Sequence, residues 1–491
     1  MSASTSGLVV PDLLALRVAQ GPDDTVMNVN DASTITYGDW DRRSNAVARG
    51  LVDRGVSRGA VVALFYGGME WIDYIVAYMS VLKSGGTAIH LNDTMPREEV
   101  QRRLDQCAVV GIIRAAHLAA PSQPGAWTAT TAELASADTS PVGVVLTPED
   151  YSDILYSSGT TQLSKGLRVP HGNLTFGRGP EGFKQFGDPR PLITPMQLGT
   201  TASVTTTNVA ISLQATLVVA PPGDVERMGA LIARYGVGSV MVNPMIGVRM
   251  VTARIHERHD LSSVHTLGTA AAAMPPAIAD KLLRMFPNAR MTGTYTEIGA
   301  VPGVIVTTYD PAKPHSVGRP SPSTRLQVTD ADGNPVPDGT LGEIRIRAAA
   351  PKRRHVDESL EPADGWTRTH DLGIVREDGE LYLFDRAVDA LRVDGELIST
   401  LHTEAAVYEC PDVREAAIVG LPGTDGSSKI ALVVALTEGG DLERVREFLA
   451  GRLQPQAQPT RFLVVDALPF GPNGKVRKTE LRKQLLEPVA A

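Results

Sequence analysis

The segment Leu155–Leu167 reads LYSSGTTQLSKGL and places hydroxyl side chains, a glycine and a lysine between two short apolar runs. Such a segment can present hydroxyls and backbone N–H groups to phosphate oxygens, and Lys165 can add a mobile positive charge. It is not a Walker loop, because five residues separate Gly159 from Lys165 and the residues that follow read as a strand. We therefore predict a phosphate-binding hairpin loop. The alternative is a polar hairpin tip without a ligand.

The loop belongs to a part of the chain in which short β-branched runs alternate with amphipathic segments. Between about residues 60 and 300, VVALF precedes WIDYIVAYMSVLKSG, TAIHL precedes MPREEVQRRLDQC, and ATLVVA precedes VERMGALIARY. This alternation is typical of parallel sheets covered by helices. We therefore predict an α/β fold with a large N-terminal domain of stacked α/β sheets.

The pattern changes towards the C-terminus. Between Ser323 and Arg386, turn sequences such as DADGNPVPDG and REDGE separate alternating strands such as EIRIR and ELYLF. After Arg386, short strands surround one amphipathic helix, DLERVREFLAGRL. We expect an N-terminal domain over 1–385, with a β-rich subdomain at about 320–385, and a small, mobile α+β domain over 386–491 that is hinged near 385–390.

Composition excludes several classes of protein. The chain has 491 residues, 43% hydrophobic and 21% charged, which is typical of a globular protein with more than one domain. Its formal net charge of −8 gives no overall basic field for nucleic acid or an anionic membrane. No signal peptide or membrane span is evident, and Cys107 and Cys410 form neither a disulfide framework nor a zinc motif. We expect a cytoplasmic protein.

Three other segments have simple interpretations. His256 and His259 have a spacing that could bind a metal, but no third ligand is evident, and we interpret them as part of an exposed helix end. GVGSVM at 236–241 lacks the full dinucleotide fingerprint, so we do not expect NAD. The mixed-charge run PKRRHVDESLEPADG at 351–365 is expected to be a solvated loop.

Six further short motifs follow the loop SSGTTQLSKGL along the chain. They are YTE at 295–297, SVGRP at 316–320, GEIRIR at 342–347, THDLG at 369–373, DRAVDALRVDG at 385–395 and PNGKVRK at 472–478. In this order they resemble the adenylate-forming superfamily, which includes acyl-CoA synthetases, nonribosomal adenylation domains, luciferases and stand-alone amide bond synthetases. The resemblance covers nearly the whole chain, and it implies a ligase that uses ATP and Mg²⁺ to form an acyl-adenylate and pyrophosphate.

The resemblance also implies roles at the nucleotide. Thr296 is expected to hydrogen-bond the α-phosphate, and Glu297 to give Mg²⁺ a hard oxygen ligand. Asp371 is expected to accept the ribose hydroxyls, and Arg386 to complete the ribose and phosphate contacts. Lys475 is expected to stabilise the charge that moves as pyrophosphate leaves. The implied ATP- and AMP-binding residues are Ser157, Ser158, Gly159, Thr160, Thr161, Lys165, Ala271, Ala272, Thr294, Tyr295, Thr296, Asp371, Arg386 and Lys475.

Several positions depart from the pattern of the superfamily. Gln162 and Ser164 stand where the phosphate loop usually has Gly and Pro, and Val388 stands at the hinge, where Asp or Lys is typical. Gln197 stands where an aromatic ring or a histidine often gates the acyl pocket, which leaves room for a broad, flat acid. The implied acyl-pocket residues are Gln197, Asn243, Gly268, Ala270 and Gly293.

A different segment, RVDGELIS, corresponds to the acceptor channel of thioester-forming members. The implied channel residues are Asp394, Gly395 and Glu396. Carboxylates there would repel the phosphates of CoA and could orient or help to deprotonate an amine, which favours an amide bond synthetase. Simple solvation of both acids is the alternative. No carrier-type serine motif is evident, so we expect no fused carrier domain.

We therefore expect an ATP-dependent ligase of secondary metabolism that joins a small, aromatic carboxylic acid to a small amine. The alternatives are an acyl-CoA or aryl-CoA ligase and, from another class, a non-catalytic nucleotide-binding relative. Retention of Thr296, Glu297, Asp371, Arg386 and Lys475 together argues against the last of these.

Overall fold

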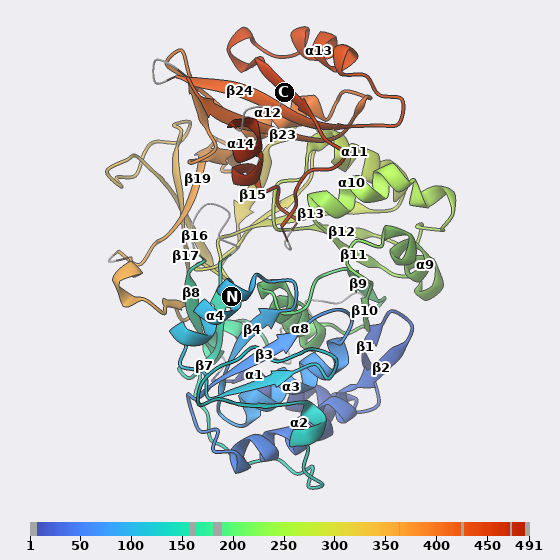
Figure 1. The fold of residues 1–491 in the computed structure, drawn as a ribbon, viewed down its shortest axis with the longest axis vertical. Coiled ribbons are helices and arrows are strands. Elements are labelled where there is room, and N and C mark those ends of the chain that lie inside the picture. The colour runs from blue at the N-terminus through green and yellow to red at the C-terminus, as the bar shows by residue number, and fades with distance from the viewer. Residues whose placement is uncertain are drawn as a thin grey trace.

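The protein is described here by a computed structural model that covers residues 7–157, 164–179, 189–362, 364–423, 427–471 and 474–486. A large N-terminal α/β domain carries a smaller C-terminal domain, drawn in orange and red in Figure 1. The predicted α/β fold class is confirmed. Among the described residues, no helix is both long enough and apolar enough to cross a membrane.

Seven of the described strands form one sheet of the N-terminal domain. In spatial order they are β18 (Arg354–His355), β8 (Gly166–Pro170), β7 (Tyr151–Tyr156), β4 (Thr87–Asn92), β3 (Val61–Tyr66), β5 (Gly111–Arg114) and β6 (Trp127–Ala129). The strands from β7 to β6 pair in parallel, whereas β7 and β8 form an antiparallel hairpin. The predicted phosphate loop is the connection of this hairpin.

Thirteen other described strands form a second, mixed sheet. In spatial order they are β16 (Thr324–Thr329), β17 (Gly342–Ala348), β19 (Thr367–Val375), β20 (Leu381–Arg386), β15 (Ser316–Pro320), β14 (Ile305–Thr308), β13 (Arg290–Tyr295), β12 (Thr266–Thr269), β11 (Ser239–Val242), β9 (Leu192–Thr194), β10 (Leu217–Val219), β1 (Thr25–Val29) and β2 (Ser33–Thr36). The strands β13, β12, β11, β9, β10 and β1 are parallel. Beyond β13 the sheet continues through the antiparallel strands β14 and β15, and then through the antiparallel strands of the predicted β-rich region.

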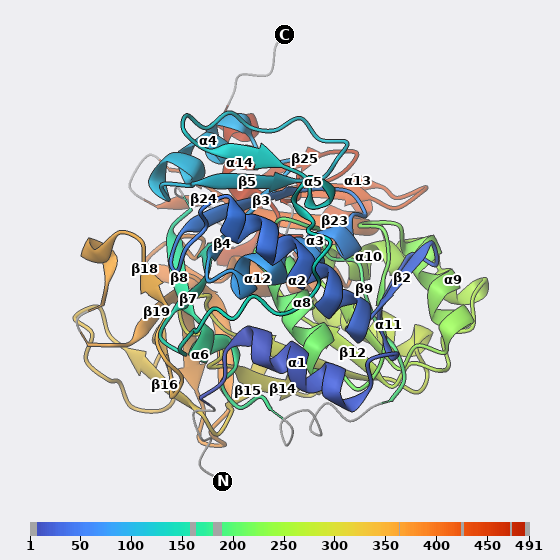
Figure 2. The same ribbon diagram turned by 90° about the horizontal axis from the view of Figure 1, so that it is seen from below.

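Helices cover the faces of these sheets. They are α1 (Val10–Gln20), α2 (Tyr37–Asp53), α3 (Trp71–Lys83), α4 (Arg97–Gln106), α5 (Thr131–Leu134), α6 (His171–Leu174), α8 (Thr201–Ser212), α9 (Val225–Tyr235), α10 (Pro244–Ala253) and α11 (Pro276–Met285), with 3₁₀ turns η1 (Ile255–Glu257) and η2 (Glu358–Leu360). Figure 2, a view from below, shows α1, α2 and α3 on the near face of the N-terminal domain, where they pack on one another.

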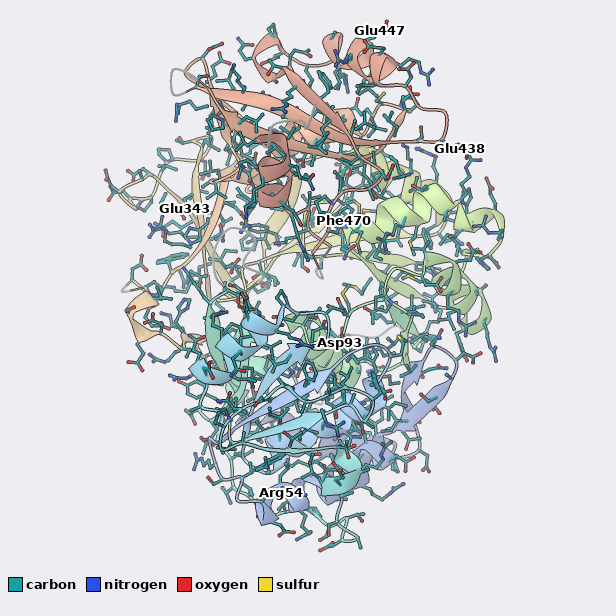
Figure 3. The ribbon with its side chains drawn as sticks, in the orientation of Figure 1. Arg54, Asp93, Glu343, Glu438, Glu447 and Phe470 are labelled. Atoms are coloured by element: carbon teal, nitrogen blue, oxygen red, sulfur yellow. The ribbon has the colours of Figure 1, made fainter. Side chains whose placement is uncertain are left out.

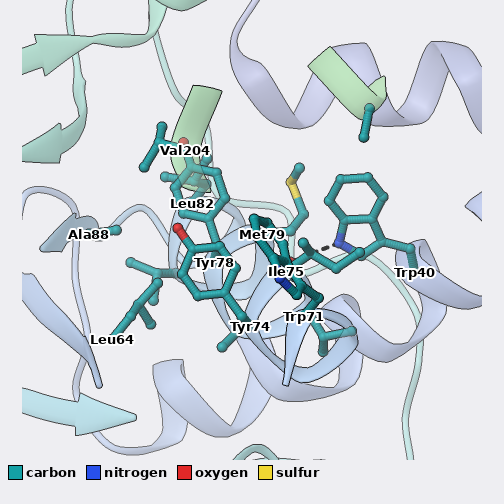
Figure 4. Packing of buried hydrophobic residues seen from close by; sticks show 14 of the residues in the cluster. Trp40, Leu64, Trp71, Tyr74, Ile75, Tyr78, Met79, Leu82, Ala88 and Val204 are labelled. Carbon is teal, nitrogen blue, oxygen red and sulfur yellow. Dashed lines mark hydrogen bonds between the residues drawn. The ribbon is translucent and has the colours of Figure 1, made fainter. Parts of the chain in front are cut away.

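Helix α3 is buried on most of its circumference, which explains why it lacks a clear polar face. Its aromatic and aliphatic side chains fill the core of the N-terminal domain (Figure 4). The indole of Trp40 on α2 donates a hydrogen bond to the carbonyl of Ile75, 2.8 Å away. This bond satisfies the polar atom of a ring that has no exposed surface.

The C-terminal domain contains a three-stranded sheet, of the described strands β23 (Val413–Pro422), β24 (Ser428–Leu436) and β25 (Arg461–Val464). It also contains the hairpin of β21 (Leu391–Val393) and β22 (Glu396–Ile398), the helices α12 (Thr400–Val407), α13 (Leu442–Ala450) and α14 (Lys478–Leu486), and the turn η3 (Pro455–Ala457). The chain enters this domain through a turn at Val388, whose side chain is 58% exposed.

One hydrophobic cluster is shared by the two domains. It joins Val240 and Leu267 of the large sheet to Ile418 and Leu432 of the C-terminal sheet. Helix α10 lies against β23 at this boundary. The two domains are therefore held together by apolar contact as well as by the chain.

The prediction of a solvated loop over 351–365 was wrong for the start of the run, whereas residues 357–360 are exposed as predicted. Arg353 is only 7% exposed, and its guanidinium donates to Asn173 Oδ1 and to the carbonyl of Ile298, each at 3.0 Å. The next residues form β18, which pairs with β8. Arg353 has partners far away in the sequence, which a pattern of mixed charge does not reveal.

Candidate active site

The predicted ribose-binding residues meet at the antiparallel side of the large sheet. Asp371 of β19 and Arg386 of β20 are register partners, and Arg386 Nε lies 3.3 Å from Asp371 Oδ1. The hydroxyl of Tyr295, at the end of β13, donates to Asp371 Oδ2 over 2.8 Å. Each oxygen of this carboxylate thus has one donor and keeps lone pairs for further donors. The group is suited to accept two hydroxyls from a vicinal diol.

Thr296 and Glu297 follow directly after β13. The hydroxyl of Thr296 donates to the carbonyl of Gly303 over 2.6 Å, which fixes its side chain at the strand end. Burial raises the pKa of the Glu297 carboxyl, and the Lys475 ammonium opposes that rise. The site therefore contains a largely desolvated acidic oxygen close to a cation.

Lys475 lies at the base of a tight loop that precedes α14. The loop is closed by a bridge between Phe470 and Val476, by the hydrogen bond from Gly471 N to Lys475 O (2.8 Å), and by that from Gly474 N to Gly471 O (2.9 Å). Figure 3 places Phe470 on the side of the C-terminal domain that faces the N-terminal domain. The segment that carries Lys475 therefore lies at the boundary with the N-terminal domain, where Gly474 approaches Asn243.

The electrostatic surroundings of Lys475 include the residues described above. Burial lowers its pKa, and the Arg386 guanidinium lowers it further, whereas the carboxylates of Asp371 and Glu297 oppose both effects. The structure thus brings the predicted catalytic lysine to the predicted metal ligand and ribose acceptor, although it comes from the other domain.

Gly474 is the point at which this loop contacts the N-terminal domain. Its φ of +76° is favourable only for glycine, and a Cβ at this position would lie 2.3 Å from Asn243 Nδ2. Asn243 is held in place as the N-cap of α10, since its Oδ1 accepts from Ile246 N over 2.9 Å. A predicted acyl-pocket residue therefore packs directly against the lysine loop, which sequence reasoning did not anticipate.

The other predicted pocket residues lie where parallel strands end. Gly268 is in β12, Ala270 follows it, and Gly293 in β13 is the register partner of Thr269. Strand β12 neighbours β11, which ends just before Asn243. The carboxyl ends of parallel strands are the usual place for ligands in open α/β sheets. The same edge holds Ala271, with a φ of +75°, and Ala272, which is exposed.

Gln197 follows β9 and turns towards the other sheet. Its Nε2 donates to Thr94 Oγ1 over 3.1 Å and lies 3.4 Å from Asn92 Oδ1. Thr94 and Asn92 belong to the segment at the end of β4, so Gln197 links the two sheets. Its amide is held by protein groups in this structure, and its role in an acyl pocket stays a prediction. The predicted nucleotide residue Thr294 is exposed within β13.

Only the two ends of the predicted phosphate loop can be described. Ser157 N donates to Lys165 O over 3.0 Å, and Lys165 N donates to Ser157 Oγ over 3.1 Å, which closes the β7–β8 hairpin. Ser164 is bound by Glu99 and Arg102 of α4, an anchor that the sequence did not indicate. The predicted phosphate contacts of Ser158, Gly159, Thr160 and Thr161 lie outside the described residues, as does Gln162.

The predicted acceptor-channel residues form the turn of a hairpin. Asp394 and Gly395 connect β21 to β22 with φ angles of +48° and +85°, and Glu396 begins β22. An Asp-Gly pair with two positive φ angles is what a two-residue hairpin turn requires. All three residues are exposed. The geometry of the turn is therefore enough to explain why Asp and Gly occur at positions 394 and 395. Their role in an acceptor channel stays a prediction.

Of the histidines at 256 and 259, His256 is exposed and His259 makes a surface contact. His259 Nε2 lies 2.7 Å from Glu226 Oε1, and Arg258 donates to the same carboxylate. No group of three or more metal-ligating side chains occurs in the part of the chain that the structure describes. The segment has the structural interpretation that was predicted, although η1 is a 3₁₀ turn.

Family models match most of the chain. The model of the AMP-binding enzyme matches residues 14–351, and that of the AMP-binding enzyme C-terminal domain matches 402–475. Among curated proteins, 4-coumarate–CoA ligase 5 of Oryza sativa subsp. japonica is 27% identical, over 99% of this chain and 97% of that protein. Bacitracin synthase 1 of Bacillus licheniformis is 24% identical, over 96% of this chain but 9% of that protein.

Solved structures have the same fold over nearly their whole length. The anthranilate CoA ligase AuaEII in complex with anthranoyl-AMP superposes with a TM-score of 0.86 at 18% identity, covering 99% of both chains. The amide bond synthetase McbA from Marinactinospora thermotolerans superposes with a TM-score of 0.80 at 20% identity, covering 97% of this chain and 99% of that one.

Proposed function

The chain belongs to the family of AMP-binding enzymes, and from that premise we propose that it makes an amide from a small aromatic carboxylic acid and an amine. Membership confirms that it is an ATP-dependent, AMP-forming ligase of the adenylate-forming superfamily. The observation that supports the catalytic role of Lys475 is that Glu297, Asp371 and Arg386 all influence its pKa electrostatically, from across the domain boundary.

In the proposed first half-reaction, a carboxylate oxygen of the acid attacks the α-phosphorus of ATP. The bond from that phosphorus to the bridging oxygen breaks, and pyrophosphate leaves with the bonding electrons. The Lys475 ammonium stabilises negative charge on the oxygens of this centre. Asp371, oriented by Tyr295 and Arg386, holds the ribose. Thr296 turns its hydroxyl from the carbonyl of Gly303 to the α-phosphate.

The donor set fits one magnesium ion bound together with a nucleotide. Mg²⁺ prefers oxygen ligands and is commonly held by one or two carboxylates plus substrate phosphates. Glu297 provides a largely buried carboxylate beside the proposed phosphate position, and it would be the protein ligand. When bound, the ion neutralises phosphate charge.

In the proposed second half-reaction, an amine nitrogen attacks the acyl carbon and AMP leaves. The nitrogen loses a proton as the amide forms, and a carboxylate can accept it. Asp394 and Glu396 are the candidates, because they are exposed acids on the C-terminal domain, just beyond the turn at Val388. Rotation of that domain about the turn would carry their hairpin to the adenylate.

A thioester is the second candidate product. It is favoured by the whole-length similarity to a rice protein described as a 4-coumarate–CoA ligase. In that case CoA sulfur, and not an amine nitrogen, would attack the acyl carbon.

The deciding experiment begins with pyrophosphate release across a panel of aromatic and aliphatic acids, with Mg²⁺ or with EDTA. The best acid is then incubated with ATP and either CoA or a broad amine panel, and products are identified by mass spectrometry. We expect release to require acid and Mg²⁺, and amide to form faster than thioester. Robust thioester with no amide from any amine would reject the amide proposal.

Charge-neutral variants test the acceptor residues. Asp394→Asn with Glu396→Gln should slow amide formation and raise the use of CoA, because the repulsion of its phosphates is removed. Glu438→Gln is the matched control, since Glu438 is an exposed acid at a distant loop of the same domain (Figure 3). Equal effects of the two changes would remove Asp394 and Glu396 from the acceptor site.

A further inference from the structure

A second lysine, three residues after Lys475, lies in a largely buried polar cluster. The side chain of Lys478, the first residue of α14, is 17% exposed, and its Nζ lies 2.7 Å from Glu404 Oε1. The same Nζ donates to Thr400 Oγ1 over 2.9 Å. Glu404 Oε1 also accepts from Ile418 N over 2.8 Å, so α12, α14 and β23 meet at one ion pair.

The cluster continues to the nucleotide side of the active site. Thr400 donates through its hydroxyl to Asp385 Oδ2 over 2.8 Å, and its backbone N–H donates to the same oxygen. Asp385 Oδ1 accepts from Arg386 N over 2.8 Å. Asp385 is the second-to-last residue of β20 in the large sheet and is 4% exposed. A continuous path therefore joins the backbone of Arg386 to the first turn of α14.

The path reaches Lys475 through a short, constrained segment. Only Val476 and Arg477 separate the two lysines. Val476 is fixed by its bridge to Phe470, and Arg477 N donates to Pro469 O over 2.8 Å. Little conformational freedom is left between the cluster and the lysine loop.

We infer that Lys478 is a positioning residue, which holds the Lys475 loop in register with Arg386 through Thr400 and Asp385. Its effect on the reaction rate rests on the proposed role of Lys475 in adenylate formation. The cluster spans the turn near Val388, since Asp385 precedes that turn and the other members follow it. It therefore favours the present domain arrangement, in which the Lys475 ammonium lowers the pKa of the Glu297 carboxyl.

The charges of the cluster are consistent with this role. Burial lowers the pKa of Lys478, but the carboxylates of Glu404, Asp389 and Asp385 raise it by more, so the ammonium stays charged. The competing interpretation is that the ion pair contributes only to stability. A buried pair often adds little stability over apolar replacements, whereas removing one partner leaves an unpaired charge. The test must therefore separate folding from positioning.

Four variants make that separation. Lys478→Met removes the charge, Lys478→Arg keeps it, and Lys478→Met with Glu404→Gln removes both charges of the ion pair. Lys483→Met is the matched control, since Lys483 is an exposed lysine on the same helix. Melting temperatures identify variants that are merely unstable.

The first measurement does not depend on activity. Lysines are acylated briefly with an amine-specific reagent, and labelling of Lys475 is measured by mass spectrometry relative to the exposed Lys429. We expect Lys478→Met and the double variant to raise the relative labelling of Lys475 several-fold, and Lys478→Arg and Lys483→Met to leave it near the parent value.

The second measurement is ATP–pyrophosphate exchange. Displacing a catalytic group by about 1 Å can cost roughly 100-fold in rate, so kcat should fall by about that factor in Lys478→Met and in the double variant. KM for ATP should stay within about threefold, because Asp371 and Tyr295 are unchanged. Lys478→Arg should recover most of the rate.

The outcomes are distinct. If Lys478→Met matches Lys483→Met in labelling and exchange, the inference is overturned. Parent values of Lys475 labelling and of exchange in the double variant would also overturn it, since the unpaired charge of Glu404 would then explain the defect of Lys478→Met. If the parent shows no exchange with any acid, the proposed function fails, while the labelling of Lys475 still decides whether Lys478 positions its loop.

Discussion

The two halves of the candidate active site are held in different ways. Asp371, Arg386 and Tyr295 occupy nearby strands of one large sheet, and their side chains bond to one another. Lys475 projects from a loop of the other domain, which contacts the sheet domain through a glycine. The ribose side is fixed by backbone pairing over several strands, whereas the lysine side depends on a few local contacts.

This difference separates two kinds of sensitivity. Removing a side chain from the ribose side leaves the sheet intact. ATP should then bind more weakly, while the reacting atoms stay aligned. A small displacement of the lysine loop leaves the ribose contacts intact. ATP binding should then persist, while adenylation slows. Four experiments test whether the two halves of the site differ in this way.

The largest effect is expected for Lys475→Ala. A cation about 4 Å from the reacting oxygens contributes roughly 4 kcal/mol at an effective dielectric near 20, or about a thousandfold in rate. Adenylation should fall by about that factor, measured by ATP–pyrophosphate exchange. Given a synthetic acyl-adenylate, the variant should still transfer the acyl group within about tenfold of the parent rate, since pyrophosphate has already left.

A melting curve is the control for Lys475→Ala, because an unfolded C-terminal domain would imitate the loss. Equal failure in both assays would mean that Lys475 also acts in acyl transfer or holds the domain arrangement. Parent rates in both assays would remove it from the catalytic site.

The next largest effect is expected for Gly474→Ala. The new Cβ would collide with Asn243, so the loop must move, and a shift of about 1 Å can slow adenylation by roughly 100-fold. KM for ATP should change little. Gly439→Ala is the matched control, because Gly439 has a similar φ of +72° but a Cβ there would meet no atom within 4 Å. A comparable loss in the control would assign the effect to backbone strain.

A smaller effect, on binding, is expected for Tyr295→Phe. Losing one hydrogen bond to the Asp371 carboxylate costs about 1.5 kcal/mol, which corresponds to roughly tenfold in KM for ATP. The value of kcat should stay within about threefold. Tyr309→Phe, which removes a 3.0 Å bond to Asp280 on α11, controls for loss of a tyrosine hydroxyl. A defect confined to kcat would contradict the division between the two halves.

The smallest effect concerns pH. Burial raises the pKa of Glu297 above its usual value, so the carboxyl gains its proton at a higher pH than an exposed glutamate does. Since Mg²⁺ binds the carboxylate, adenylation should weaken as the pH falls through this raised pKa, by at most about tenfold per pH unit. Raising Mg²⁺ should shift the acid limb to lower pH. If the loss of adenylation at low pH does not change with the Mg²⁺ concentration, the titrating group is not Glu297.

The sequence predicted the parts of the fold and site that depend on local pattern or on motifs. The β/α alternation predicted the parallel strands, and the motifs around Asp371, Arg386 and Lys475 predicted residues that the fold brings together. The bond from Tyr295 to Asp371 could not be predicted, because it requires the spatial order of the five strands from β13 to β19.

Contacts between distant segments were missed for the same reason. Arg353 was predicted to lie in a solvated loop because the neighbouring sequence is charged. Its partners, Asn173 and the carbonyl of Ile298, are distant in the sequence and could not be predicted. Asn243 and Gly474 come from different domains, and only the folded chain shows that they touch. Lys478 can be noticed in the sequence as a second lysine shortly after Lys475. Its carboxylate partner, Glu404, cannot be predicted, because it lies far away in the sequence.

The hydrophobic cluster shared by the two domains makes their arrangement sensitive to temperature. Any rotation that separates α10 from β23 exposes apolar side chains of this cluster to water. Such exposure increases the heat capacity, and its cost near room temperature is mainly entropic and declines on cooling. Cooling should therefore favour the rotated state. In the proposed mechanism, the relative rates of the two half-reactions would then change with temperature through the contact between the domains.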